Sequence, residues 1–458
     1  MNNWECIEMR VIIIGAGKVG FNLAQMLSME KHEVMVIEQN EERQEILNEQ
    51  LDIQVIGGSG SSWEALDEAG IKQADMVVAV TESDELNMVM CLMAKQFGVK
   101  TTVARVRNPE YTESHFSAPL SVMGIDLIIN PERITALEIA KLVEVPEALN
   151  VDYYAGGKLL LVQFKMAPNA PVIGRQLLEL KANLPFIVVA VENGQQMLIP
   201  GGNYRIAADD DLYVMTRTEG LEQVEKLFGV NRPPTEKITI LGGGRVGYYL
   251  AHTLETKRPD VEVKIIEKDG RRARKVSHNL NRALVLHGDG TDIDMLEDEN
   301  VGGSDLFVAV TNDDRLNLLC SLIARNLGVD RTIAQVRRSE LLPLMEQVGI
   351  DVVVNPQLLT AGAVLKFMRK GDIISVTVLG QNRAEMIELV ARPGSRVINK
   401  SLNDISFPAG TIVGAIQRGN EVIIPHGGHI IKAGDHVMVF CLPHTVPKIE
   451  HLFAGGVR

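Results

Sequence analysis

The sequence predicts an α/β fold in which two Rossmann-like, doubly wound parallel-sheet domains are each followed by a small α+β subdomain. Three observations predict this fold. The chain repeats itself over nearly its whole length, each repeat opens with short β-branched runs that alternate with helical stretches, and each repeat closes with short strands around glycine turns. The 458 residues, 46% of them hydrophobic, supply enough apolar material for several cores.

The repeat is visible in three parts of the chain. RVIIIGAGKVGFNLAQML (10–27) aligns with KITILGGGRVGYYLAHTL (237–254), and AVTESDELN (79–87) aligns with AVTNDDRLN (309–317). The ends of the two repeats also resemble each other. The predicted domains are residues 10–150 (nucleotide-binding), 151–228 (small α+β), 229–236 (linker), 237–371 (nucleotide-binding) and 372–454 (small α+β). Pro233 and Pro234 stiffen the linker.

The elements of the first part follow in a regular order. The runs RVIIIG, EVMVIE, DIQVIG, DMVVAV, TTVARV and DLIINP predict strands, and helices are expected to begin near Val19, Glu41, Ser62, Glu85, Pro109 and Pro131. Strand–helix alternation predicts a parallel sheet, and strands that are apolar throughout are typical of a sheet covered on both faces. In the second part, turns such as 192–194 and 201–202 predict antiparallel hairpins.

Each repeat carries a GxGxxG motif between a strand and a helix. The first glycine permits a tight turn, the second lets the backbone approach a pyrophosphate, and the third lets the helix pack against the strand. The helix N-terminus then offers free N–H groups to phosphates. The predicted phosphate-binding residues are Gly15, Ala16, Gly17, Lys18, Val19 and Gly20, and Gly242, Gly243, Gly244, Arg245, Val246 and Gly247.

An acidic residue ends the second strand of each repeat, Glu38 in the first and Glu267 in the second. A carboxylate at this position accepts hydrogen bonds from a ribose diol and repels a 2′-phosphate. The sequence therefore favours NAD(H) or an adenine nucleotide over NADP(H).

The loop after the third strand differs between the repeats. Repeat two has HGDGTD, with Gly288 and Asp289, where repeat one has GGSGSS, with Ser59. A carboxylate accepts from an adenine amino group or a ribose, and a serine is a weaker partner. We therefore expect the two halves to differ in nucleotide preference.

A polar constellation recurs where the fourth strand meets its helix. Thr81 with Glu82, and Thr311 with Asn312, lie at the carboxyl edge of the sheet, where ligands bind, and are predicted cofactor contacts. Asp84 and Asn87 follow in repeat one, and Asp314 and Asn317 follow in repeat two. Helix capping is the alternative explanation for the Thr and Asp residues, but it does not account for the Asn three residues into each helix.

Several classes of function are not supported. A net charge of −13 argues against nucleic-acid binding, 4% aromatic residues argue against base stacking, and no apolar run is long enough to span a bilayer. The four scattered cysteines are typical of reduced cytosolic thiols. We find no proton relay for hydride transfer, and His426 and His429 lack a third ligand for a metal. The sequence predicts a cytosolic protein with no catalytic residue and no metal.

Together these motifs resemble the regulator-of-potassium-conductance domain, also called the potassium-transport nucleotide-binding domain. The resemblance rests on both glycine turns, both acidic strand ends, HGDGTD, the two AVT motifs and the IINP and VVNP stretches. It runs from about Arg10 to the end of the chain. The duplicated arrangement resembles the TrkA-type regulatory subunits of Trk potassium uptake systems.

The resemblance implies that the nucleotide is a regulatory ligand rather than a substrate. It implies self-association into a dimer or a tetrameric ring, and peripheral attachment to the inner face of the membrane through a Trk-type channel subunit. It leaves open which half binds NAD(H) and which binds ATP or ADP. The alternatives are an NAD-dependent oxidoreductase and a stand-alone nucleotide sensor for another transporter.

Overall fold

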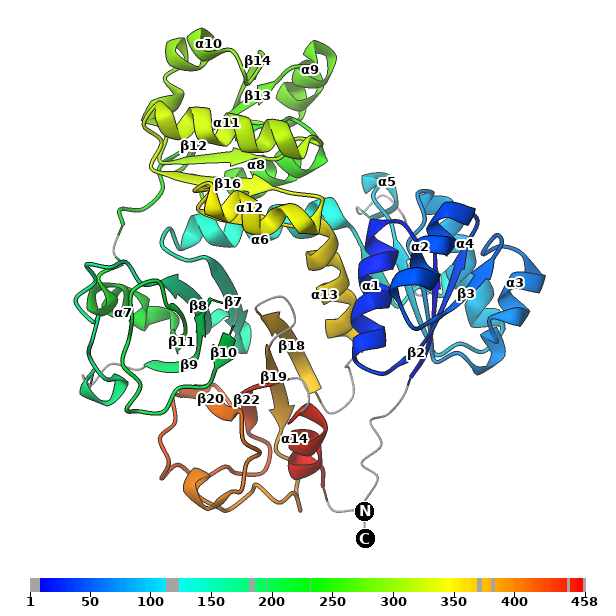
Figure 1. The fold of residues 1–458 in the computed structure, drawn as a ribbon, viewed down its shortest axis with the longest axis vertical. Helices are drawn as coiled ribbons and strands as arrows, with labels where there is room; N and C mark the ends of the chain where they lie inside the picture. Colours follow the sequence, from blue (N-terminus) through cyan, green and yellow to red (C-terminus); the bar gives the residue numbers. More distant parts are fainter. Residues whose placement is uncertain are drawn as a thin grey trace. The chain divides into compact units, whose positions relative to one another are not determined.

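Two six-stranded parallel sheets form the centres of the two larger domains (Figure 1). The computed structural model describes residues 9–112, 123–180, 186–194, 196–230, 232–368, 373–379, 384–442 and 445–455. The strand orders are β3-β2-β1-β4-β5-β6 in the first sheet and β14-β13-β12-β15-β16-β17 in the second. The two orders correspond strand for strand, so the repeat seen in the sequence is a repeat of topology.

The elements of the two parallel-sheet domains follow the predicted strand–helix alternation. In the first domain they are β1 (Arg10–Ile14), α1 (Lys18–Met29), β2 (Glu33–Glu38), α2 (Glu41–Gln50), β3 (Gln54–Gly57), α3 (Trp63–Glu68), β4 (Met76–Ala79), α4 (Asp84–Gln96), β5 (Thr101–Arg105), α5 (Pro109–Thr112), β6 (Leu127–Ile129) and α6 (Pro131–Glu144). In the second they are β12 (Lys237–Leu241), α8 (Arg245–Lys257), β13 (Glu262–Glu267), α9 (Gly270–Asn279), β14 (Leu284–His287), α10 (Ile293–Asp298), β15 (Leu306–Ala309), α11 (Asp314–Asn326), β16 (Arg331–Gln335), α12 (Leu342–Gln347), β17 (Val352–Val354) and α13 (Pro356–Met368).

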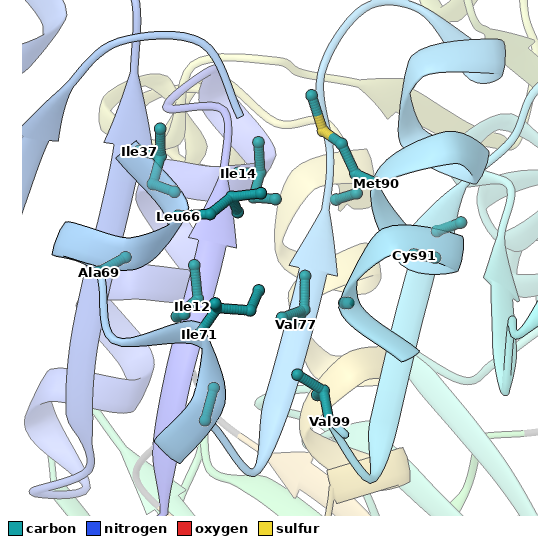
Figure 2. Packing of buried hydrophobic residues seen from close by; sticks show 14 of the residues in the cluster. Ile12, Ile14, Ile37, Leu66, Ala69, Ile71, Val77, Met90, Cys91 and Val99 are labelled. Atoms are coloured by element: carbon teal, nitrogen blue, oxygen red, sulfur yellow. The ribbon is translucent and has the colours of Figure 1, made fainter. Parts of the chain in front are cut away.

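The central strands are buried on both faces, as their apolar sequences predict. All four residues of β4 are buried, and so are the last four residues of β1. Figure 2 shows Ile12 and Ile14 of β1 in one cluster with Leu66 of α3, Val77 of β4 and Met90 of α4. A parallel sheet covered by helices on both sides leaves its ligand-binding loops at the carboxyl ends of the strands.

Each parallel-sheet domain is followed by a five-stranded antiparallel sheet. The orders are β10-β9-β11-β8-β7 and β21-β20-β22-β19-β18, which correspond strand for strand when read in this direction. The elements are β7 (Asn150–Tyr154), β8 (Leu159–Lys165), β9 (Phe186–Asn193), β10 (Gln196–Leu198), β11 (Asp211–Arg217) and α7 (Leu221–Phe228), and then β18 (Ile373–Leu379), β19 (Ala384–Val390), β20 (Thr411–Arg418), β21 (Glu421–Ile423), β22 (His436–Cys441) and α14 (Val446–Phe453). The predicted fold class is confirmed.

The chain divides into two compact units. One unit contains both parallel sheets, up to Ile139 and from Glu236 to Leu365, and the other contains both antiparallel sheets. The chain passes between the units three times: inside α6, inside α13, and between Thr235 and Glu236, a stretch that belongs to no helix or strand. In the described part of the chain, no helix is both long enough and apolar enough to cross a bilayer.

Candidate nucleotide-binding sites

The first and third glycines of each turn are required by the chain's own geometry. Gly15 and Gly242 have φ of +101° and +106°, which favours glycine. A Cβ on Gly20 would overlap the carbonyl oxygen of Gly15, and one on Gly247 would overlap that of Gly242. These glycines therefore let each helix approach its strand closely, as predicted from the sequence.

The second glycine of each turn has no such structural requirement. Gly17 and Gly244 have extended φ/ψ angles that any residue adopts, and a Cβ on either would meet no atom of the described chain within 4 Å beyond its immediate neighbours. Each is the N-cap residue of a long helix, and no side chain in the described structure caps it. The first N–H groups of α1 and α8 are therefore left to bind an anion.

The acidic residue at the end of the second strand is buried beside the glycine turn. Glu38 is 7% exposed; its Oε2 accepts from the Ala16 amide at 2.5 Å, and its Oε1 accepts from Gln39 and Asn40 at 2.9 Å each. Such a carboxylate orients the phosphate-binding turn, and its remaining lone pairs are available to a ribose.

Repeat two reproduces this contact. Glu267 is 5% exposed, and its Oε2 accepts from the Gly243 amide at 2.8 Å. A guanidinium lies near each carboxylate, Arg43 at 3.9 Å from Glu38 and Arg272 at 3.5 Å from Glu267. Neither arginine was predicted from the sequence, although each lies five residues after its glutamate.

The loops after the third strands differ chemically, as the sequence predicts. Asp289 Oδ2 pairs with Lys268 Nζ at 2.6 Å, and its Oδ1 accepts from Thr291. The ion pair with Lys268 lowers the pKa of Asp289. In repeat one, Ser59 Oγ lies 2.8 Å from Ser61 Oγ and accepts from the Ser61 amide at 3.3 Å. Asp289 thus presents a carboxylate already engaged by a lysine that sequence reasoning did not link to it.

The recurring asparagine ties two strands together at the carboxyl edge of the sheet. Asn87 is fully buried; its Oδ1 accepts from the Thr81 amide at 2.9 Å and from the Thr81 hydroxyl at 2.6 Å, and its Nδ2 donates to Arg105 O at 2.8 Å. Asn317 makes the matching bonds to Thr311 and Gln335. Each asparagine therefore joins the end of the fourth strand to the end of the fifth.

The helix caps are made by residues other than those of the recurring Thr, Asp and Asn constellation. The N-caps of α4 and α11 are Ser83 and Asp313, whose side chains accept from the first-turn amides. Asp84 instead accepts from the amides of Arg107 and Asn108 at 2.8 and 2.7 Å. The bonds to Asn87 use the Thr81 amide and the hydroxyl proton, so the Thr81 hydroxyl is left to accept a hydrogen bond from a ligand rather than donate one.

A cavity of about 450 Å³ lies over the first glycine turn. Of the predicted residues it is lined by Gly15, Gly17, Lys18, Val19, Glu38, Thr81 and Glu82. Its charged lining also includes Arg43, Arg105 and Arg107, and Arg337 of the second repeat in the same compact unit. Five cationic side chains thus face two carboxylates, a charge balance suited to a polyphosphate. A second cavity, of about 500 Å³, is lined by the predicted residues Lys18 and Asn312, together with Asp313, Asp314, Arg315, Arg337 and Arg338.

The other potentially reactive groups among the described residues are metal-ligand side chains and thiols. The described residues contain no group of three or more His, Cys, Asp or Glu side chains placed to hold a metal ion. Burial raises the pKa of the Cys91 thiol and of the Cys320 thiol to about 12, so both remain protonated at neutral pH.

The fold and these sites define a class of protein: a tandem of nucleotide-binding Rossmann-like domains, each with an appended antiparallel subdomain. The TrkA-N domain family matches residues 11–131 and 238–356, and the TrkA-C domain family matches residues 161–229 and 386–454. The chain therefore belongs to the TrkA family of potassium uptake proteins. It is a subunit of a potassium uptake system, and members of this family are regulatory rather than enzymatic.

Relatives extend over the full chain. The Trk system potassium uptake protein TrkA homolog 1 of Methanosarcina mazei is 39% identical over 97% of this chain and 100% of its own length. TrkA of Halomonas elongata is 34% identical over 98% of this chain and 99% of its own.

Solved structures share the fold at lower identity. The GsuK channel bound to NAD has a TM-score of 0.62 at 19% identity and covers 98% of this chain and 79% of its own. GsuK bound to ADP has a TM-score of 0.51 at 18% identity, covering 79% and 69%. At these identities the likeness shows the fold alone.

Proposed function

We propose that this chain gates a Trk-type membrane potassium transporter in response to NAD(H) and adenine nucleotides bound at its two glycine turns. The observation that supports the proposal most strongly is the second glycine of each turn. The chain itself does not require a glycine at Gly17 or Gly244, but a pyrophosphate approaching the helix N-terminus does. The nucleotide complexes of the GsuK channel support the same ligand class.

Gating requires only that each ligand bind one conformation of the protein more tightly than another. Each glycine turn is held by a buried carboxylate that also faces the predicted ribose position. A nucleotide that takes up lone pairs of Glu38 or Glu267 therefore acts directly on the turn and on the helix behind it. Self-association into a dimer or ring, and attachment to the inner face of the membrane through the transporter, complete the proposal.

The proposal is tested by measuring nucleotide binding and then potassium flux. Titration calorimetry of the full chain should show binding of NADH, ATP or ADP, and Glu38→Ala should weaken binding at the first site by about tenfold or more through loss of charge-assisted hydrogen bonds. Glu41→Ala, at the exposed start of α2, is the matched control. Liposomes containing the membrane subunit should then show potassium flux that changes with nucleotide only when the chain is added.

Two other functions give different results in the same experiments. An NAD-dependent oxidoreductase would oxidise NADH steadily with a small carbonyl substrate. A nucleotide sensor for another transporter would bind nucleotide but leave the Trk-type flux unchanged.

A further inference from the structure

The two repeats differ in charge at the carboxyl end of the fifth strand. β5 ends at Arg105 and β16 ends at Gln335. The two positions are equivalent, because Asn87 Nδ2 donates to the carbonyl oxygen of Arg105 at 2.8 Å and Asn317 Nδ2 donates to that of Gln335 at 2.9 Å. The backbones are held alike, so the repeats differ here in their side chains.

Arg105 faces the cavity over the first glycine turn. One of its terminal nitrogens donates to Thr81 O at 3.4 Å, and no acceptor among the described residues lies within hydrogen-bonding distance of its buried Nε. The charges around it are those of Arg107, Glu132, Asp84 and Glu82. Asp84 already pairs with Arg107, at 3.3 Å, and with backbone amides. Among the described residues, none of the three carboxylates lies close enough to Arg105 to form an ion pair with it.

Gln335 offers different chemistry at the same place. It is 3% exposed, its Nε2 donates to Thr311 O at 3.3 Å, and its buried Oε1 has no donor among the described residues. A neutral carboxamide oxygen accepts from hydroxyl or amide N–H groups and cannot balance the charge of a phosphate.

The strand order fixes which part of a nucleotide meets these residues. The ribose is expected at Glu38, where β2 ends, and the first phosphates at the N-terminus of α1, beside β1. Because β4 and β5 lie on the other side of β1, the rest of the ligand passes over the ends of these strands. The distal group is the terminal phosphate of a triphosphate, or the second nucleoside of a dinucleotide.

We propose that Arg105 makes the first site selective for a nucleoside triphosphate, and that Gln335 makes the second site selective for a dinucleotide whose distal nucleoside is uncharged or hydrogen-bonds through amide and hydroxyl groups. This inference rests on the proposed nucleotide-binding function. It assigns one ligand class to each half of the chain, through residues that the glycine turns and acidic strand ends do not include.

Three neighbouring positions also change charge between the repeats. Glu132 stands where repeat two has Gln357, but it approaches Arg245 at 3.8 Å and forms no ion pair with Arg105. Glu82 stands where repeat two has Asn312, but Glu82 is exposed and water screens it, whereas Arg105 is partly buried. Arg338 stands where repeat one has Asn108, but it approaches Asp314 at 3.7 Å.

The experiment measures nucleotide binding at each site separately, in the full chain. Gly244→Asp silences the second turn and Gly17→Asp silences the first, and at both positions the added Cβ has free space. In the Gly244→Asp chain, calorimetry should show ATP binding at least about tenfold more tightly than NADH. Arg105→Gln should remove about tenfold of the ATP affinity and change the NADH affinity by less than about threefold.

Two further variants keep the result interpretable. Arg105→Lys should retain most of the ATP affinity because it keeps the charge, and Gln335→Arg in the Gly17→Asp chain should raise ATP affinity at the second site. Thermal unfolding of each variant checks that its fold is retained. The inference is overturned if Arg105→Gln weakens ATP and NADH equally, or if the unmodified first site prefers NADH. If neither single-site chain binds any nucleotide, the proposed function itself fails.

Discussion

At the scale of single residues, the buried asparagines Asn87 and Asn317 hold together the carboxyl edge of each parallel sheet. Each satisfies the amide and hydroxyl of a threonine on one strand end and a carbonyl oxygen on the next. Buried polar groups that lose such partners are costly, so a change at either asparagine affects the sheet edge as well as the side chain itself.

Asn87→Ala is expected to lower the free energy of unfolding by about 2–4 kcal/mol, because it leaves the Thr81 amide and the Arg105 carbonyl oxygen without this partner. Urea unfolding of the full chain measures the change. The matched control is Ser83→Ala, which removes the cap of α4 and an exposed hydrogen bond to Glu85 and should cost about 1 kcal/mol. Equal losses in the two variants would contradict the role assigned to Asn87.

Glu225 predicts a pH dependence in the antiparallel unit. Burial, followed by the negative charges of Glu147 and Glu222, raises the pKa of Glu225 from 4.5 to about 7. The folded state therefore favours the protonated form, so the stabilisation is complete below about pH 4.5 and is lost as the pH rises through 7. Because Glu225 is only half-buried, solvent screening limits the effect to about 1 kcal/mol.

Thermal unfolding of wild type and Glu225→Gln between pH 5 and pH 8 tests this dependence. The variant should gain stability relative to wild type as the pH rises. Glu45→Gln, on the exposed face of α2 in the other compact unit, is the control, and its difference from wild type should not change over this range. A constant difference between wild type and Glu225→Gln across the range would contradict the assignment.

At the scale of elements, each strand–turn–helix unit divides its tasks among three glycines. The first adopts a positive φ, the third allows the helix to contact the strand, and the second faces open space at the helix N-terminus. Structural and ligand-binding requirements therefore fall on different residues of one motif, which makes them separable by mutation.

Gly20→Ala should destabilise the first domain by about 1–3 kcal/mol or more, because its Cβ would overlap the Gly15 carbonyl oxygen. Gly17→Ala should cost at most about 1 kcal/mol, since its Cβ meets open space. It should nevertheless weaken nucleotide binding, because the methyl group occupies the approach of the phosphates. Chemical unfolding and calorimetry on both variants check the pair, and the reverse ranking in stability would rule out this division of roles.

At the scale of the whole molecule, the chain is a duplication of one arrangement of strands and helices. Both parallel sheets and both antiparallel sheets have corresponding strand orders. Differences between the copies at equivalent positions therefore show where the halves have diverged, as with Ser59 and Asp289 or Arg105 and Gln335. The shared residues include those on which the fold depends, such as both buried asparagines, and those that a ligand requires, such as Gly17 and Gly244.

The proposed attachment to a membrane partner makes a prediction about the intact protein. In cells that lack the potassium transporter subunit, the chain should remain in the supernatant after membranes are sedimented, and restoring that subunit should move part of it to the membrane fraction. Immunoblotting of both fractions measures the distribution. Sedimentation with membranes in the absence of every potassium transporter subunit would contradict attachment through that partner.

The sequence by itself determined the fold class, the duplication, both glycine turns and both acidic strand ends. These features are local, because strand runs, turn glycines and helix starts are encoded by neighbouring residues: α2 begins at Glu41, as predicted, and α1 begins at Lys18, one residue from the predicted Val19. Only the tertiary structure decided which distant side chains meet. It placed Glu38 on the Ala16 amide, Lys268 on Asp289, and Arg105 beside the first turn. The reason is that right-handed crossovers bring the carboxyl ends of strands far apart in the chain to one edge of the sheet.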